Sequence, residues 1–173
     1  MTEWVSGRGA AEILGAAGIS RTMVCRMLAA GLAGAPIRTP GATLYDAARV
    51  RELLKRPSVD ADRLPAPTDR ALLEVRVAAG SQHGAEYEIG NAGALVRMHA
   101  RALIERHGFL PVVTSCCGFV LGGGEAVGVD ALPDNQARLR VRPPGPWFAA
   151  FDGHRMSTGA GNAWRLWLQP EVA

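Results

Sequence analysis

Two arginines on one side of a predicted helix are the side chains of this chain best suited to bind a polyanion. Arg21 and Arg26 fall in residues 21–30, where apolar side chains recur at the spacing of a buried helix face. These apolar residues are Val24, Met27 and Leu28. The arginines fall on the opposite side, together with Thr22 and Cys25, so we expect them to face solvent. A guanidinium can donate two parallel hydrogen bonds, which suits a phosphate group or the edge of guanine.

Ser20 and Thr22 stand at the start of this helix. Ser20 is a natural N-cap, and the hydroxyl and free backbone N–H groups at a helix start suit a phosphate group. A first helix is predicted over residues 8–15, with Arg8 at its start as a further phosphate contact. Gly18 lies between the two helices, where a tight turn needs a residue that tolerates positive φ.

A short β-ribbon is predicted over residues 36–45, because Pro40-Gly41 is a turn signal between β-prone flanks. Arg38 and Thr39 lie on this ribbon, and we expect them to contact a phosphate backbone. Asp46 then caps a third helix that ends at the next proline. The residues of this helix that we expect to pack inward are Val50, Leu53 and Leu54.

Two short helices, a ribbon and a third helix follow one another in the first 57 residues. In this order they resemble the winged helix-turn-helix of the MerR and excisionase superfamily. The matching segments are residues 10–15, 19–24, 28–32 and 38–41. The resemblance implies that the second helix enters the major groove of DNA and that the ribbon, as the wing, touches the backbone or the minor groove. The alternative is a helix-turn-helix that serves protein contact.

The chain departs from the MerR regulators after the third helix. Those regulators continue into a long dimerising coiled coil, whereas Pro57 and a proline-rich stretch follow here, without a heptad pattern. Metal or drug sensing by the MerR mechanism is therefore not implied.

The positive charge of the chain is concentrated in the segment that carries these motifs. The whole chain has a formal net charge of +3, from 19 basic and 16 acidic residues. Residues 1–57 hold eight of the basic and four of the acidic residues, a net charge of +4, which leaves −1 on the rest. A positive field on the predicted DNA-binding segment favours a polyanionic partner, although a GC-rich genome would also enrich arginine.

Residues 58–67 are rich in proline and predict a semi-rigid linker between residues 1–57 and a second domain, residues 68–173. In the second domain a strand is predicted over residues 72–77 and a helix over residues 92–107. The apolar stripe of this helix comprises Leu95, Val96, Met98, Ala102, Leu103 and Ile104. Further strands are predicted from residues 109–121, 126–132, 139–141, 147–151 and 164–168, with a hairpin turn at residues 122–124. The fold class is α+β, a winged helix-turn-helix followed by a domain in which one long helix packs on an antiparallel sheet.

Other constellations in the second domain allow two interpretations each. Cys116-Cys117 could ligate a soft metal or act as a redox switch, or could be buried small hydrophobes. Arg138, Arg140 and Arg142 alternate along a strand, and form either a second anion-binding surface or the solvated face of a sheet. We find no Ser/His/Asp order, paired carboxylates or metal-ligand spacing, so we expect no catalysis, no cofactor and no metal site.

The chain has no run approaching the ~18 apolar residues that span a bilayer. Its N-terminus lacks a basic region followed by an apolar segment. We therefore expect no membrane partner and a cytoplasmic location.

Together these features predict a bacterial or phage transcriptional regulator that is not an enzyme. It would bind double-stranded DNA, reading the major groove with helix 21–30 and the backbone with wing 36–45. A homodimer through residues 68–173 would supplement the few contacts that one small domain can make. Two alternatives remain. One is an excisionase-like architectural recombination factor. The other is a ligand or metal sensor, or an enzyme, in the C-terminal domain that is targeted to DNA.

Overall fold

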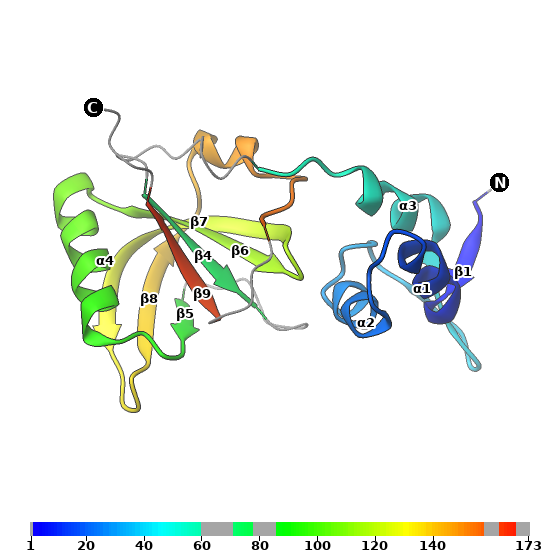
Figure 1. Cartoon of the computed structure of the whole chain (residues 1–173), viewed down its shortest axis with the longest axis horizontal. Coiled ribbons are helices and arrows are strands. Elements are labelled where there is room, and N and C mark those ends of the chain that lie inside the picture. The colour runs from blue at the N-terminus through cyan, green and yellow to red at the C-terminus, as the bar shows by residue number, and fades with distance from the viewer. Residues whose placement is uncertain (1, 60–70, 78–85, 158–162, 169–173) are drawn as a thin grey trace. The chain divides into compact units, whose positions relative to one another are not determined.

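The computed structural model describes residues 2–59, 71–77, 86–157 and 163–168, and the fold is mixed α+β (Figure 1). The chain divides after Pro57 into two compact units. We call the described residues up to Pro57 the N-terminal unit, and those from Ser58 onward the C-terminal unit. Each unit has its own helices and its own sheet, so each is described by itself.

The N-terminal unit combines three helices with a three-stranded antiparallel sheet in the order β1-β3-β2. Its elements are β1 Trp4–Ser6, α1 Gly7–Gly15, α2 Arg21–Ala29, β2 Ile37–Arg38, β3 Thr43–Asp46 and α3 Ala47–Lys55. The three helices and the ribbon predicted from the sequence are confirmed as elements. Strand β1 was not predicted, because its three residues have no alternating pattern of their own and gain order by pairing with β3.

Side-chain caps fix where the three helices of the N-terminal unit begin. Ser6 Oγ accepts a hydrogen bond from the Gly9 N–H at 3.2 Å, and Ser20 Oγ accepts one from the Met23 N–H at 3.3 Å. Asp46 Oδ1 accepts from the Ala48 N–H at 2.9 Å. These bonds satisfy N–H groups that have no partner within the helix, and those of Ser20 and Asp46 confirm the two predicted caps.

The core of the N-terminal unit lies where the three helices meet, because α1 contacts both α2 and α3. The fully buried side chains that close this core are Ala10, Leu14, Val24, Met27, Val50 and Leu53. The faces predicted to be buried on the second and third helices are therefore confirmed, apart from Leu54, which is half-buried. Burial of these apolar side chains is what holds α2 in place.

The C-terminal unit is built on one curled six-stranded sheet with the strand order β5-β8-β7-β6-β4-β9. Its strands are β4 Ala71–Arg76, β5 Glu86–Ile89, β6 Leu110–Cys116, β7 Phe119–Ala131, β8 Ala137–Arg142 and β9 Trp164–Leu168. The prediction of an antiparallel sheet is wrong at one pair, since β4 and β6 run parallel while the other pairs are antiparallel. Helix α4, Ala94–His107, lies in the connection between β4 and β6, as a parallel pair requires.

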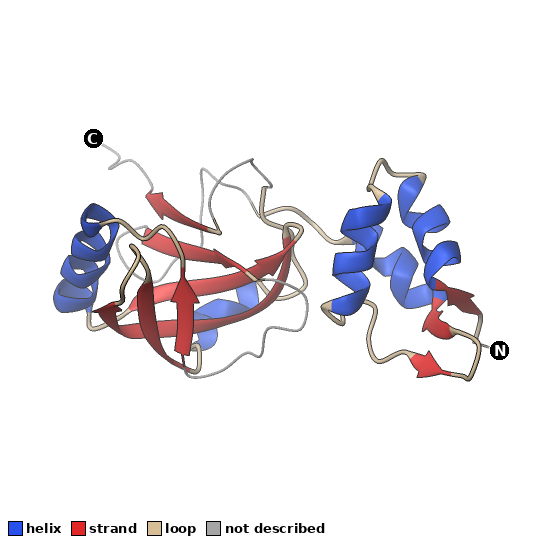
Figure 2. Cartoon of the chain, turned by 90° about the horizontal axis from the view of Figure 1, so that it is seen from below, coloured by secondary structure: helices blue, strands red, loops and turns tan. Residues whose placement is uncertain are grey.

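Two apolar clusters cover the two faces of this sheet. On one face α4 packs through Ala100, Leu103 and Ile104 against the larger cluster. On the other face the 3₁₀ helix η2, Pro146–Ala150, packs with Phe151 against the smaller cluster. Figure 2 shows these two helices on opposite sides of the strands. The strand predicted at residues 147–151 is therefore wrong, because proline at the start of η2 and two aromatic contacts favour a helical turn.

Half of the apolar stripe predicted for α4 faces solvent instead of the sheet. Leu95 is 62% exposed and Met98 is 58% exposed, and Ala102 is exposed as well. Apolar residues lie on both sides of this helix, and periodicity alone did not separate the side that meets the sheet from the outer one.

The hairpin between β6 and β7 turns at Cys117 and Gly118, not at the three glycines predicted to form it. Both turn residues have positive φ, 52° and 83°, which a two-residue turn of type I′ requires. The glycines at residues 122–124 lie inside β7. There the ring of Phe148 packs so close to Gly123 that a Cβ atom would overlap it.

Part of the predicted linker belongs to the C-terminal unit. The Val59 N–H donates to the Arg155 carbonyl at 2.7 Å, and the Val59 side chain packs on the smaller cluster. The rest of the predicted linker, residues 60–67, lies outside the described residues. Among the described residues of the chain, no helix has the length and apolar character to cross a bilayer.

Glu125 joins β7 to the segment before η2. This residue is 7% exposed, and its carboxylate accepts hydrogen bonds from Arg142 Nε at 2.7 Å, from the Gly145 N–H at 3.1 Å and from Trp147 Nε1 at 3.0 Å. Burial raises the pKa of this carboxyl, but the bonds from Trp147, Arg142 and Gly145 outweigh it, so its pKa lies below the ordinary value.

We predict that Gly123→Ala destabilises the C-terminal unit by about 1–3 kcal/mol, because the added methyl group displaces the Phe148 ring. Urea unfolding followed by tryptophan fluorescence measures this free energy. Gly90→Ala is the matched control, because nothing lies within 4 Å of its Cβ position and its φ is not positive. Equal free energies of unfolding for the two variants would contradict the close approach of Phe148.

We predict that Glu125→Gln lowers the free energy of unfolding at neutral pH by about 1–3 kcal/mol, since an amide cannot accept all three bonds. Because the pKa of Glu125 is lower in the folded than in the unfolded chain, its contribution is present above the unfolded pKa. It is lost as the pH falls through the folded pKa.

The wild type should therefore lose more stability on acidification than Glu125→Gln, as urea unfolding between about pH 6 and pH 3 would show. The control is Glu88→Gln, which removes an exposed carboxylate partner of Arg138. Parallel pH profiles for the wild type and Glu125→Gln would rule out this role of Glu125.

Candidate nucleic-acid interface

The outer side of α2 is exposed and mostly polar. Arg21, Thr22, Cys25 and Arg26 are all exposed on it, while the apolar side of the same helix is buried. These four positions recur at helical spacing, so their side chains lie along one face. The sequence analysis placed its candidate residues of this helix on the surface, and the structure has them there.

Ser20 acts first as a structural residue. Its Oγ accepts the Met23 N–H, so the hydroxyl oxygen is engaged in capping α2. The hydroxyl hydrogen can still be donated to a ligand. The backbone N–H groups of Arg21 and Thr22 belong to the first turn, where no carbonyl within the helix can accept them. The start of α2 therefore presents donors and the positive end of the helix dipole.

The β2–β3 hairpin forms the second part of the candidate interface. Thr39 Oγ1 donates to the Ala42 carbonyl at 3.0 Å and accepts from the Ala42 N–H at 3.1 Å, which closes the turn. Arg38 precedes this turn with an exposed side chain. The hydroxyl of Thr39 thus stabilises the hairpin, and Arg38 is the residue of the pair with a charge to offer.

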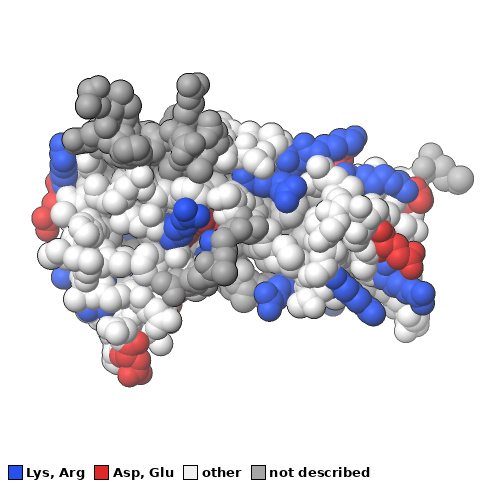
Figure 3. Space-filling view, viewed as in Figure 1, with Lys and Arg blue, Asp and Glu red and all other residues white. Residues whose placement is uncertain are grey.

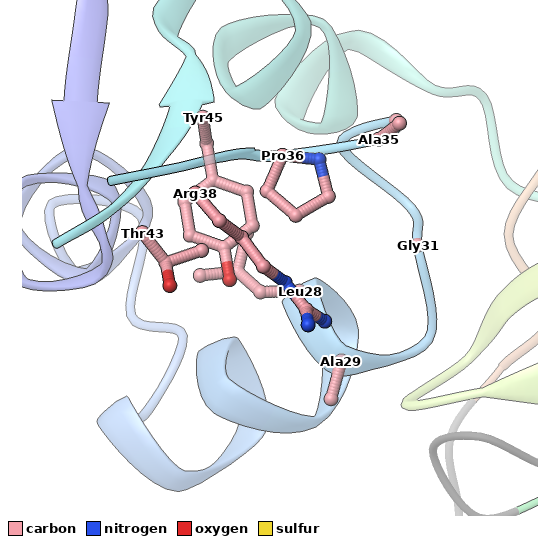
Figure 4. A pocket seen from close by; sticks show the side chains of 9 residues that line it. Leu28, Ala29, Gly31, Ala35, Pro36, Arg38, Thr43 and Tyr45 are labelled. Carbon is pink, nitrogen blue, oxygen red and sulfur yellow. The ribbon is translucent and has the colours of Figure 1, made fainter. Parts of the chain in front are cut away.

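A hollow of about 610 Å³ lies between the end of α2 and this hairpin. Its polar side chains are Arg38, Thr43 and Tyr45. The remaining residues that line it are Leu28, Ala29, Gly31, Gly34, Ala35 and Pro36. Figure 4 shows the Arg38 side chain reaching from β2 toward the last turn of α2, with Thr43 and Tyr45 beside it.

Thr43 and Tyr45 are site residues that the sequence analysis missed. They are two positions apart on β3, so they share one face of the strand, and Thr43 pairs with Arg38 across the hairpin. That alternation was present in the sequence, but only the register of the hairpin brings the three side chains together. Neither residue belongs to α2, so the helical pattern gave no indication of them.

Ion pairing distributes the charge of the N-terminal unit unevenly. Each of its four acidic side chains has a basic partner in the pairs Arg8–Glu12, Arg49–Asp46, Arg51–Glu3 and Lys55–Glu52. In the face shown in Figure 3, acidic side chains, in red, lie among basic side chains, in blue. Arg21 and Arg38 make no ion pair within the described part of the chain. Positive charge without a carboxylate partner therefore remains on α2 and on the hairpin.

Arg8 is less suited to bind an anion than the other candidates. Its Nε lies 3.2 Å from Glu12 Oε1, one turn further along α1. The pair is exposed and therefore weak, but the carboxylate offsets the charge that Arg8 would offer to a phosphate group.

Each arginine of β8 has a carboxylate partner, which favours the solvated-sheet interpretation over a second anion-binding surface. Arg138 pairs with Glu88 at 2.8 Å, and the other two pairs are Arg140–Asp130 at 3.2 Å and Arg142–Glu125 at 2.7 Å. Carboxylates therefore offset all three charges, as in the solvated-sheet interpretation.

The two adjacent cysteines at the β6–β7 turn are free thiols. Cys116 is buried and Cys117 is half-buried, and their Sγ atoms lie 3.9 Å apart at the β6–β7 turn. Across the described ranges, no three His, Cys, Asp or Glu side chains gather closely enough to hold a metal ion.

Comparison with protein-family models, with curated proteins and with solved structures finds no match. The function is therefore inferred from the geometry and charge of the candidate interface itself.

We predict that Ser20→Ala lowers the stability of the N-terminal unit by about 1 kcal/mol, since the Met23 N–H loses its acceptor. Thermal unfolding followed by far-UV circular dichroism measures the effect. Ser20→Asp should keep the wild-type stability, because an aspartate carboxylate also caps a helix start. A Ser20→Asp variant as unstable as Ser20→Ala would show that the cap is not what Ser20 contributes.

Proposed function

We propose that this chain is a sequence-specific DNA-binding protein that regulates transcription, with its N-terminal unit acting as a winged helix-turn-helix. One observation carries the proposal. Arg21 on α2 and Arg38 on the hairpin lack ion-pair partners among the described residues, whereas every carboxylate of the unit is paired elsewhere. A surface with unpaired arginines on a helix and a neighbouring hairpin suits a duplex, whose phosphates supply the missing negative charge.

The shape of α2 supports a role in the major groove. The groove admits one α-helix, and the residues near the start of that helix reach the base edges. Arg21, Thr22, Cys25 and Arg26 form the exposed face of α2. Arg21 and Arg26 are the side chains that we propose read guanine or hold phosphate, and Ser20 and Thr22 would bind a phosphate group at the helix start.

The hollow beside the hairpin supports a role for the wing in holding the backbone. Arg38 supplies a charge there, and Thr43 and Tyr45 supply hydroxyl donors. A phosphate group accepts several hydrogen bonds at once, so three donors around one hollow suit it better than an isolated arginine. Thr39 would contact the backbone only through its position beside Arg38, since its hydroxyl closes the turn.

We predict that Arg21→Ala and Arg38→Ala both weaken DNA binding, with different signatures. The full chain is first used to select a duplex from a random-sequence library, and its affinity is then measured by fluorescence anisotropy. Arg21→Ala should cost about 1–3 kcal/mol and relax sequence preference, as expected for a base contact. Arg38→Ala should weaken binding to all duplexes alike and reduce the salt slope by about one, as expected for a phosphate contact.

Arg51→Ala is the matched control, because it removes the same charge from an exposed arginine of α3 whose partner is Glu3. Ser20→Asp is a second test at the same site. It keeps the cap but places a negative charge at the start of α2, so it should lower affinity without lowering stability. If Arg21→Ala and Arg38→Ala lost no more affinity than Arg51→Ala, the proposed interface would be wrong. A wild type that binds no duplex even at about 50 mM salt would contradict DNA binding altogether.

A further inference from the structure

The outer side of α4 carries an apolar stripe that no other described residue of the C-terminal unit covers. Leu95 and Met98 are 62% and 58% exposed, and Ala102 continues the stripe one turn further along. The inner side of the helix is occupied separately by Ala100 and Leu103, which pack on the sheet. The unit covers one apolar side of this helix and leaves the other exposed, and an exposed apolar surface of this kind is typical of a binding site.

This outer side has a hollow as well as protruding side chains. Ala94, Ala102 and Ala131 leave a depression of about 390 Å³ beside Met98. Arg101 links the helix to β7 there, because it donates through Nε and Nη2 to the Val129 carbonyl at 3.1 and 3.0 Å. A protruding methionine next to an alanine-lined depression is a shape that a second copy of itself complements.

Charges of both signs line the hollow, and one of them, Arg101, is directed to the Val129 carbonyl. Arg97 lies near the start of α4 and Glu105 near its end, and both line the depression. When two such helices pack antiparallel, Glu105 of each can lie opposite Arg97 of the other. A single-sign rim would instead favour a different, oppositely charged partner.

We infer that this face binds a second copy of the chain, with α4 against α4 about a two-fold axis. Met98 of each copy fills the depression over Ala102 of the other, and Leu95 packs beside it. The inference extends the proposed function, because a dimer presents two DNA-binding surfaces. Its evidence lies in the C-terminal unit alone, so it stands or falls separately from DNA binding.

The test is light scattering with size-exclusion chromatography on the full chain without DNA. The wild type should elute with twice the 18.3 kDa chain mass. Leu95→Glu and Met98→Glu should each raise the dimer dissociation constant at least about tenfold, because a charge at the centre of an apolar interface must be desolvated. Far-UV circular dichroism should match the wild type, since both side chains are exposed.

Leu168→Glu is the matched control, because Leu168 is an equally exposed leucine, 63%, on the edge strand β9. It should leave the dimer intact. The inference is overturned if the wild type is a monomer at about 100 µM. It is also overturned if both α4 variants dimerise as the wild type does, or if Leu168→Glu is the variant that dissociates the dimer. Since no DNA is present, failure of the DNA-binding proposal would leave these outcomes unchanged.

Discussion

The orientation of α2 depends on the burial of one side of three nine-residue helices. Leu14 on α1 is fully buried where α1 meets both other helices, and Val24 and Met27 turn the apolar side of α2 into the same core. Isolated helices of this length are marginal in water, so their order comes from this packing. Once the apolar side is fixed, helical geometry leaves Arg21 and Arg26 on the opposite side, facing solvent.

Local chemistry made much of the N-terminal unit predictable. Ser20 and Asp46 cap helices through bonds to residues two or three positions away, so the signal lies within a few residues of sequence. Contacts between distant segments were not predictable in this way. Thr43 lies opposite Arg38 only through the hairpin register. The ring of Phe148 packs where a Cβ atom of Gly123 would lie, a contact between residues 25 positions apart. The Met98 side chain is likewise exposed because the sheet covers the other side of α4, a contact between distant segments.

The two units expose surfaces of different chemical character. In the N-terminal unit, each carboxylate forms an ion pair with another basic residue, so Arg21 on α2 and Arg38 on the hairpin have no carboxylate partner among the described residues. In the C-terminal unit the corresponding arginines of β8 are offset by carboxylates, and what remains exposed is the apolar stripe of α4. One unit is thus suited to a polyanion and the other to an apolar, self-complementary contact. A DNA-binding protein with few phosphate contacts per copy benefits from both.

The most direct test of the central claim is an NMR titration of the ¹⁵N-labelled full chain with a duplex selected from a random-sequence library. If α2 and the hairpin bind DNA, amide shifts should change most at the start of α2, around Arg21 and Thr22, and on the hairpin around Arg38 and Thr39. The amides of β8, whose arginines are paired, should change least. Shifts that stay unchanged at saturating duplex, or that change mainly in the C-terminal unit, would contradict the account.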